Sequence, residues 1–331
     1  MDLAQQLRFV KLPDGRRIAY RELGCQRQNA DKTLLVLHGL MSSRRVAMPG
    51  ASEDLLEKYG LRMIAIDRPG YGQSDPHCAQ TFKSTSQDIE YMMDELDLGE
   101  KIWLLGFSMG GAYCWGAARH IPDRLAGIAM ASPAGNFWWK SIPLEDQRAI
   151  VESYPLSDRI ISSFNKTAPF PMIRMYTQFL SDVLLNPSTD TSSGLCPPDR
   201  ECLTRPGVAS FFFRDRQESL KKNKGFGIAK DYELLNRGWD FDLKDVKREF
   251  KGKKIHIWHG DVDTVVPYRL QQCVHRAIPE VVDFHSLHNH GHFSWFCFDP
   301  TAPFEILATL FGEQEHHQDD EPSTDPKVIM V

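Results

Sequence analysis

A serine between two glycines is the residue of this chain best placed to act as a nucleophile. The segment GFSMG at 106–110 has the pattern G-x-S-x-G and follows an apolar run at 102–105. In that context the pattern predicts a sharp turn between a strand and a helix, which exposes the serine hydroxyl above the sheet. Glycines are needed because side chains at 106 and 110 would collide with so tight a turn. We therefore predict Ser108 to be a nucleophile; a serine that is incidental to a glycine-rich turn is the alternative.

A nucleophilic serine needs a base, and the base needs a carboxylate that orients it. The apolar run at 255–258 leads into the sequence HGDVD, which contains two aspartates. Asp263 lies in the loop before Pro267, from which it could reach a histidine. Asp261 lies at the end of the strand, where it is expected to cap a turn. We predict Asp263 to be the acid and keep Asp261 as the alternative.

The base is predicted from a cluster of three histidines. The apolar run at 281–284 leads into HNHGHF, in which the histidines occupy alternate positions. His292 directly follows a glycine and precedes an apolar phenylalanine, so we predict it to be the base, with His288 and His290 as alternatives. The cluster could also be read as a His-rich metal tract, but no carboxylates accompany it at fixed spacing and we predict no metal site. A serine on such a sharp strand–helix turn, called a nucleophile elbow, is followed along the chain by its acid and then its base, and the order Ser108, Asp263, His292 fits this arrangement.

The negative charge that develops on an attacked carbonyl oxygen needs backbone N–H donors. We predict one donor to be the N–H of Met109, directly after the nucleophile. The other is predicted to be the N–H of Leu40, in the loop that follows the apolar run at 33–37. Gly39 would let the backbone approach a substrate closely. His38 could be a base, but we expect it to tie this loop down by hydrogen bonding.

The elements that position these residues are short apolar runs without alternation, typical of strands buried on both faces of a parallel sheet. They lie at 33–37, 62–66, 102–105, 128–131, 255–258 and 281–284. Helical segments are predicted at 53–58, 85–96, 109–120 and 303–311. Alternation of strands and helices predicts an α/β fold with right-handed crossovers. Two strand-like runs, 7–12 and 16–23, predict a hairpin around the turn Pro13-Asp14-Gly15.

The alternation is interrupted between residues 133 and 251, a segment rich in aromatic residues, proline and serine. Such a segment is too aromatic for a linker, and we predict a mostly helical cap inserted between two strands of one sheet. The predicted units are an α/β core at 1–132 and 252–312, the cap at 133–251 and a disordered acidic tail at 313–331.

Further residues could shape a binding site. The candidates are small or aromatic: Gly39, Trp138, Trp139 and Phe293. The tryptophan pair either lines an acyl pocket or packs between the cap and the sheet. The segment SSRR at 42–45 could bind an anionic substrate, although the start of a solvated helix is the favoured interpretation. The segment at 67–75, rich in glycine and short polar residues, is expected to form a rigid wall of the site.

Composition and charge argue against several classes of protein. Apolar residues make up 42% of the 331-residue chain and charged residues 25%, which is the balance of a soluble globular protein. The net charge of −5 equals that of residues 313–331, so the body is near neutral and has no global attraction for nucleic acid. No apolar stretch approaches the ~18 residues that a membrane span needs.

The seven cysteines form no CxxC pair, which indicates reduced thiols and no thiolate zinc site. The first residues contain no apolar region of the kind found in secretory signals. The sequence also lacks a dinucleotide fingerprint and a P-loop, so we predict that no cofactor is used. We expect a cytoplasmic protein that acts on a small molecule; the sequence does not indicate a protein partner.

Together these motifs resemble those of the α/β-hydrolase superfamily. The resemblance covers about residues 7–132 and 252–312 and is carried by HG at 38–39, DRPGYGQSD at 67–75, GFSMGG at 106–111, HGDVDTVVP at 259–267 and GHF at 291–293. The resemblance implies the same site residues: Ser108, Asp263, His292, and the N–H groups of Leu40 and Met109. More narrowly, DGRRIAYRELG, DRPGYGQSDP, GFSMGG and LAG…SP…NFWW resemble a group of plant α/β-hydrolase-domain proteins of poorly defined substrate.

The sequence thus predicts a serine hydrolase of the carboxylesterase type, which cleaves a small or medium acyl ester through an acyl-enzyme on Ser108. One alternative is a small-molecule receptor on the same scaffold with little turnover. Another is an acyltransferase, thioesterase or lyase that uses the same triad. Haloalkane and epoxide hydrolases use an aspartate nucleophile, so the serine argues against both.

Overall fold

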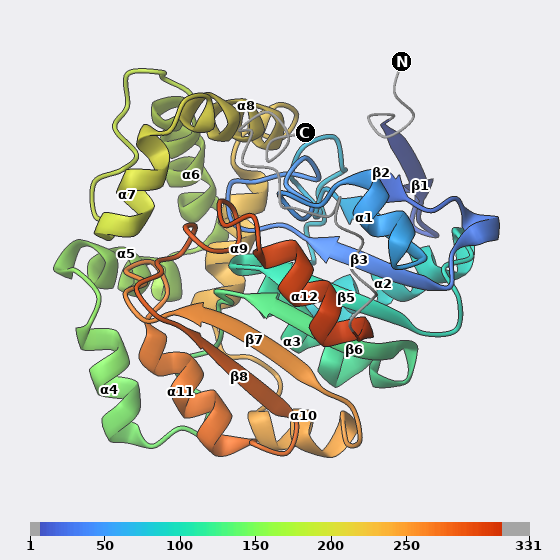
Figure 1. Cartoon of the computed structure of the whole chain (residues 1–331). Helices are drawn as coiled ribbons and strands as arrows, with labels where there is room; N and C mark the ends of the chain where they lie inside the picture. Colours follow the sequence, from blue (N-terminus) through green and yellow to red (C-terminus); the bar gives the residue numbers. More distant parts are fainter. Residues whose placement is uncertain (1–6, 313–331) are drawn as a thin grey trace.

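The computed structural model describes residues 7–312, which form an eight-stranded sheet covered by helices on both faces (Figure 1). The strands are β1 (Arg8–Lys11), β2 (Arg17–Gly24), β3 (Lys32–Leu37), β4 (Leu61–Ile66), β5 (Ile102–Phe107), β6 (Leu125–Ala131), β7 (Ile255–Gly260) and β8 (Val282–Leu287). Their order in the sheet is β1-β2-β4-β3-β5-β6-β7-β8. β1 and β2 form an antiparallel hairpin, β2 pairs antiparallel with β4, and the pairs from β4 to β8 are parallel.

Residues on both sides of the central strands are buried, which explains why their sequences do not alternate. Along β3, Leu35 and Leu37 pack on one face, and Leu34 and Val36 on the other. The first face is covered by α2 (Phe82–Glu95), α3 (Met109–His120), α10 (Leu243–Glu249) and α11 (Tyr268–Ala277). The second face is covered by α1 (Glu53–Lys58) and α12 (Ala302–Phe311), which lie in front of the sheet in Figure 1.

The predicted α/β fold, the N-terminal hairpin and the strands of the parallel sheet are confirmed. α1 and α3 have the predicted bounds, whereas α2 begins three residues earlier than the periodicity suggested. The reason is a capping box, in which Thr81 and Ser84 exchange hydrogen bonds between side chain and backbone and so satisfy the free N–H groups of the first turn. The predicted disordered tail lies outside the described residues.

The segment between β6 and β7 contains further helices, in agreement with the predicted helical insertion. They are α4 (Leu144–Glu152), α5 (Leu156–Thr167), α6 (Phe170–Leu184), α7 (Pro197–Thr204), α8 (Val208–Leu220), α9 (Phe226–Asn236) and α10. Pro143, Pro155 and Pro169 directly precede α4, α5 and α6, where their fixed φ suits a helix start. Most of these helices lie beyond the carboxyl ends of the parallel strands (Figure 1). We call residues 133–251 the insertion.

Candidate active site

Ser108 occupies a strained turn between β5 and α3. Its backbone has φ +52° and ψ −118°, a conformation that residues other than glycine rarely adopt. Three hydrogen bonds hold it there: Ser108 N–H donates to Ala131 O at 3.0 Å, and the N–H groups of Gly111 and Ala134 donate to Ser108 O at 2.9 Å. The predicted elbow is therefore present, and neighbouring β6 helps to fix it.

The two glycines of the motif are needed for different contacts. A Cβ atom at Gly106 would lie 2.8 Å from the carbonyl carbon of Gly110, across the turn. A Cβ atom at Gly110 would overlap the carbonyl oxygen of Leu37, at the end of β3. The first glycine thus permits the turn itself, as expected, and the second permits α3 to pack against the adjacent strand.

The structure brings Ser108, His292 and Asp263 into one hydrogen-bonded chain. Nε2 of His292 lies 2.9 Å from Oγ of Ser108, and Nδ1 of His292 lies 2.8 Å from Oδ2 of Asp263. Because a carboxylate can only accept, Nδ1 carries the proton and Nε2 accepts from the serine hydroxyl. This is the geometry in which a histidine can remove a proton from a serine.

Asp263 is held as an anion. Burial alone would raise its pKa, but the electrostatic interaction with His292 and hydrogen bonds from His259 and His292 outweigh burial and hold the pKa of Asp263 well below its ordinary value. Its other oxygen, Oδ1, accepts from the N–H groups of Val265 and Val266 at 2.7 and 2.9 Å. The carboxylate is therefore oriented by the loop that follows β7 as well as by the histidine.

The alternative acid, Asp261, and the alternative bases, His288 and His290, make other contacts. Asp261 accepts from the N–H of Asn289 at 2.7 Å and lies 2.9 Å from Nδ1 of His288, which is exposed. Nδ1 of His290 lies 3.3 Å from Oγ of Ser294. The turn-capping role expected for Asp261 matches these contacts, and the residue joined to Ser108 is His292.

Two backbone N–H groups in the segments that carry or adjoin the nucleophile have no protein partner among the described residues. Among residues 7–312, the N–H groups of Leu40 and Met109 donate to no backbone or side-chain acceptor. Gly39, which precedes Leu40, packs so closely that a Cβ atom there would lie 3.2 Å from Cβ of Ser108. Both predicted oxyanion donors are therefore free to bind a ligand.

His38 ties down the loop after β3, as expected. Its Nε2 accepts from the N–H of Arg68 at 3.0 Å, so the proton resides on Nδ1, which donates to Gly39 O at 2.8 Å. Burial and the neighbouring Arg68 keep the pKa of His38 well below its ordinary value. This neutral histidine is a structural member of the loop.

An ion pair between the core and the insertion fixes the same loop. Arg68 is fully buried and forms a bidentate pair with Asp231 of α9, at 2.7 and 2.9 Å. The remaining donors of Arg68 bind the carbonyl oxygens of His38 and Gly39 at 2.9 and 3.0 Å. Asp231 also accepts from two buried tyrosine hydroxyls, those of Tyr71 and Tyr113, at 2.6 and 2.8 Å. The segment at 67–75, predicted to be a rigid wall of the site, is thus anchored both to the loop after β3 and to α9.

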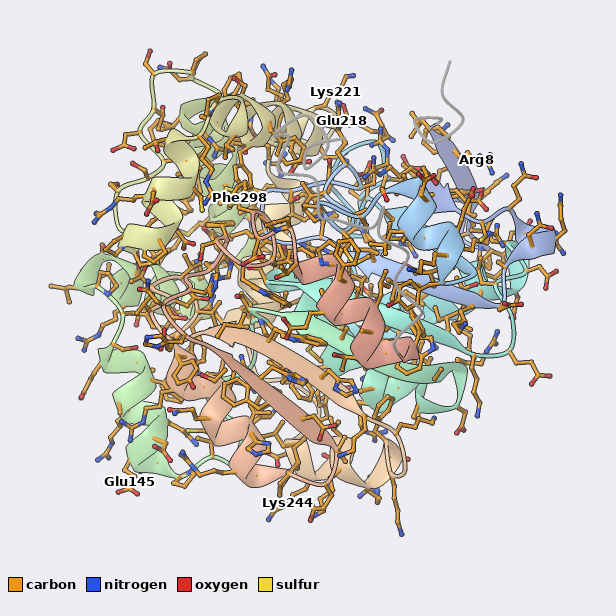
Figure 2. The ribbon with its side chains drawn as sticks, in the orientation of Figure 1. Arg8, Glu145, Glu218, Lys221, Lys244 and Phe298 are labelled. Carbon is orange, nitrogen blue, oxygen red and sulfur yellow. The ribbon has the colours of Figure 1, made fainter. Side chains whose placement is uncertain are left out.

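The favoured interpretation of residues 42–45 as the start of a solvated helix is wrong. Both serines donate to the buried carboxylate of Asp215 on α8, and burial raises the pKa of Asp215 to about 7. Arg44 pairs with Asp67 at 2.6 Å and with Glu218 at 2.9 Å. Figure 2 shows Glu218 and Lys221 together at the end of α8 that adjoins these loops. The polar residues are therefore contacts with the insertion, which hydropathy could not reveal.

The aromatic candidates divide into two groups. Trp139 is buried between Trp115 and Trp239, with ring centroids 5.6 and 5.1 Å away, so of its two interpretations core packing describes it. Trp138 is 46% exposed, with Nζ of Lys166 over its ring.

Phe293, by contrast, lies at the site. Its ring contacts the imidazole of His292, with centroids 4.8 Å apart, and the ring of Phe212 on α8 at 5.5 Å. Phe293 thus connects the predicted base to the insertion.

No metal site is apparent among the described residues, in which no group of three or more His, Cys, Asp and Glu side chains could hold an ion. None of the helices in that part of the chain is long and apolar enough to cross a membrane. The seven cysteines are all unpaired; six are buried and Cys78 is exposed.

Comparison with known proteins identifies the family. A family model described as alpha/beta hydrolase fold matches residues 32–296, so the chain belongs to the α/β-hydrolase family. An enol-lactonase from Burkholderia xenovorans LB400 has a similar structure, with a TM-score of 0.64, 18% identity and coverage of 92% of this chain and 100% of that one. A carboxylesterase structure from Nitrososphaera gargenis gives a TM-score of 0.63 at 19% identity, over 91% of this chain and 97% of the other. At such identities the likeness concerns the fold.

Curated relatives match only a part of the chain. A 2-hydroxy-6-oxononadienedioate/2-hydroxy-6-oxononatrienedioate hydrolase from Escherichia coli is 31% identical over 124 residues, which cover 34% of this chain and 39% of that protein. The chain spans less than half of the length of the curated relatives that it matches. The family and the names of the similar proteins support a hydrolase, but they do not identify the type of bond that it hydrolyses.

Proposed function

We propose that this protein is a serine hydrolase of the carboxylesterase type, which cleaves a small or medium acyl ester through an acyl-enzyme on Ser108. The observation that carries the proposal is the hydrogen-bonded chain from Oγ of Ser108 through His292 to Asp263, at 2.9 and 2.8 Å. A serine in this arrangement loses its proton to the histidine as it attacks an acyl carbon.

The first half of the reaction forms the acyl-enzyme. Nε2 of His292 removes the hydroxyl proton while Oγ of Ser108 attacks the carbonyl carbon, and Asp263 stabilises the imidazolium that results. The N–H groups of Leu40 and Met109 receive the negative charge on the carbonyl oxygen, and one such donor lowers the barrier by about 3–4 kcal/mol. The imidazolium then returns its proton to the departing alcohol oxygen, and the C–O bond to the alcohol breaks.

The second half releases the acid. A water molecule gives a proton to Nε2 of His292 and attacks the acyl carbon, and the same N–H groups hold the oxyanion. Collapse returns the proton to Oγ of Ser108 and frees the enzyme. His292, Ser108, the departing alcohol and the attacking water account for every proton transfer in this cycle, so it needs no cofactor.

The insertion is the proposed lid over the substrate. Ser108 is only 9% exposed, and Phe293 and Phe212 pack together beside His292 at the boundary between the core and the insertion. Gly39 and Phe293 are the proposed substrate-contacting residues. A covered site strengthens the electrostatic interactions on which the oxyanion hole depends.

The proposed location is the cytoplasm, because none of the seven cysteines is paired and a reducing compartment keeps thiols in that state. The resemblance to plant α/β-hydrolase-domain proteins is consistent with a small-molecule substrate and does not name one.

The test is a comparison of wild type with Ser108→Ala on short-chain p-nitrophenyl esters and with a fluorophosphonate probe. We expect the wild type to turn over the ester and to be labelled, and the variant to lose both. Equal ester turnover by both proteins would remove Ser108 from the mechanism and overturn the proposal.

The low exposure of Ser108 also favours a second candidate, a small-molecule receptor that retains its ligand beneath the insertion with little turnover. A receptor would show ligand-dependent thermal stabilisation without product release. The hydrolysis named for the Escherichia coli relative, or acyl transfer, would be distinguished by testing those substrates and nucleophiles against the same Ser108→Ala control.

A further inference from the structure

A carboxylate from the insertion reaches the backbone of the predicted base. Asp199 lies on α7 and is fully buried. Its Oδ2 accepts from the N–H of His292 at 2.8 Å, and its Oδ1 accepts from the N–H groups of Phe293 and Ser294, both at 2.9 Å. Three consecutive backbone donors, beginning with that of His292, therefore converge on one side chain that is 93 residues away in the sequence.

These donors are available because a helical turn begins at this point. The N–H of Cys297 donates to Phe293 O at 2.9 Å, which closes one turn, and the N–H groups that precede it have no carbonyl acceptor within the turn. A carboxylate is the acceptor best suited to such a cluster, because it binds several N–H groups and favours the positive end of the turn. Asp199 thus acts as a cap supplied by another part of the chain.

Gly291 is required for this approach. A Cβ atom at position 291 would lie 2.2 Å from Sγ of Cys196 and 2.5 Å from both Cγ and Oδ2 of Asp199, closer than any side chain allows. The glycine that precedes the predicted base therefore makes room for the carboxylate and for the neighbouring thiol. Its place in the sequence GHF follows from a contact with the insertion.

We propose that Asp199 is a positioning residue for His292. Through this side chain, α7 of the insertion fixes the orientation of the base relative to Ser108. The inference rests on the proposed function. Asp263 orients the imidazole ring through Nδ1, and Asp199 fixes the backbone from which the ring projects. The two carboxylates hold different parts of one residue, the ring and the backbone. Removal of either would let the imidazole move away from the orientation in which Nε2 meets the serine hydroxyl, and the reaction would slow.

The experiment measures the rate at which a fluorophosphonate labels Ser108, as a function of pH, in wild type and Asp199→Asn. The amide keeps the size of the side chain but offers one acceptor oxygen, so at least one backbone N–H loses its partner. We expect the labelling rate to fall by about 10–100-fold. The acid limb of the pH profile should move to lower pH, because loss of a nearby negative charge disfavours the imidazolium.

Asp146→Asn is the matched control. Asp146 is another buried carboxylate of the insertion; it binds Arg269 and Arg276 of α11 and thus joins the insertion to the core through residues other than Ser108 and His292. This variant should lower the melting temperature and leave the labelling rate and its pH profile unchanged. If Asp199→Asn behaves in the same way, Asp199 is only a structural attachment and the inference is wrong.

A second variant covers the case in which Asp199→Asn fails to fold. Gly291→Ala keeps the charge of Asp199 but adds a methyl group that overlaps both Asp199 and its neighbour Cys196, so the carboxylate must move and the labelling rate should fall while the acid limb moves little. An unchanged rate in folded Gly291→Ala protein would contradict the inference. Failure of the proposed function is distinguishable, because Ser108→Ala would then be labelled or turn over ester as the wild type does.

Discussion

The two sides of Ser108 are held by different means. On one side, the proposed base His292 is bound through both its ring and its backbone by the carboxylates of Asp263 and Asp199. On the other side lies the oxyanion loop, residues 38–45, which carries the proposed donor N–H of Leu40. Among residues 7–312, no carboxylate binds that donor; instead the loop is held through Arg68, which binds its carbonyl oxygens, and through Asp215, which binds its serines.

The difference distinguishes groups expected to affect the reaction rate from groups expected to affect mainly the stability of the fold. Around His292, charged groups touch a residue that would change its protonation in the proposed reaction, so we expect them to act on rate and on pH dependence. Around the oxyanion loop, the charged groups pair with one another or bind neutral backbone groups and serine hydroxyls, so we expect them to act mainly on stability. Both sides nevertheless depend on the insertion, because Asp199, Asp215 and Asp231 come from α7, α8 and α9. The insertion and the loops on both sides of Ser108 therefore form one packed unit.

Replacing the carboxylate on the ring of the base should have the largest effect on rate. Asp263→Asn keeps the hydrogen-bonding shape but lets the amide donate to Nδ1, which selects the wrong tautomer of His292. We expect kcat for ester hydrolysis to fall by about 10⁴-fold with little change in unfolding free energy. Asp261→Asn is the control, because Asp261 contacts the neighbouring loop at Asn289, and it should retain nearly full activity. The reverse result would exchange the roles of the two aspartates.

Breaking the ion pair on the oxyanion side should act on stability. Asp231→Asn leaves Arg68 buried without its counter-charge, and removal of one partner of a buried pair costs about 3–5 kcal/mol. The free energy of unfolding in urea measures this loss. Lys222→Met, which removes the insertion-side partner of the exposed pair with Asp75, should cost less than about 1 kcal/mol. If Asp231→Asn unfolds as the wild type does, the ion pair does not hold the oxyanion loop.

The fold was predictable from the sequence because its signals are local. Apolar runs without alternation predicted the parallel strands, and the segment GFSMG predicted the elbow at Ser108. Asp263 and His292 were predicted from the loops that follow two strands, since parallel strands bring their carboxyl ends to one edge of the sheet. The structure joins these residues as that reasoning requires.

The contacts made by the insertion could not be predicted in the same way. Asp199, Asp215 and Asp231 lie in helices with ordinary polar neighbours, and nothing in their local sequence distinguishes a buried carboxylate from a solvated one. Their partners are more than 90 residues away, so only the packing of the insertion on the core defines them. The same limit explains why residues 42–45 were interpreted as solvated.

The smallest predicted effect that distinguishes the two sides of Ser108 is the pH dependence of the unfolding free energy. The pKa of Asp215 rises to about 7 in the folded protein, whereas an unfolded aspartate titrates near its ordinary value. Between these pH values the folded state binds the additional proton, so the stability contributed by this group is present at low pH and is lost as the pH rises towards 7. The loss amounts to about 2 kcal/mol between pH 5 and pH 6.5. Asp215→Asn, which cannot ionise, should remove this slope from the unfolding free energy.

The measurement also tests the comparison itself. Asp199→Asn should shift the acid limb of labelling, whereas Asp215→Asn should flatten stability against pH and leave the position of that limb unchanged, since Asp215 binds Ser42 and Ser43 rather than His292. A shifted limb in Asp215→Asn would mean that the charge on the oxyanion side reaches the base. The two sides of Ser108 would then be one electrostatic unit, and the distinction between groups that affect rate and groups that affect stability would not hold.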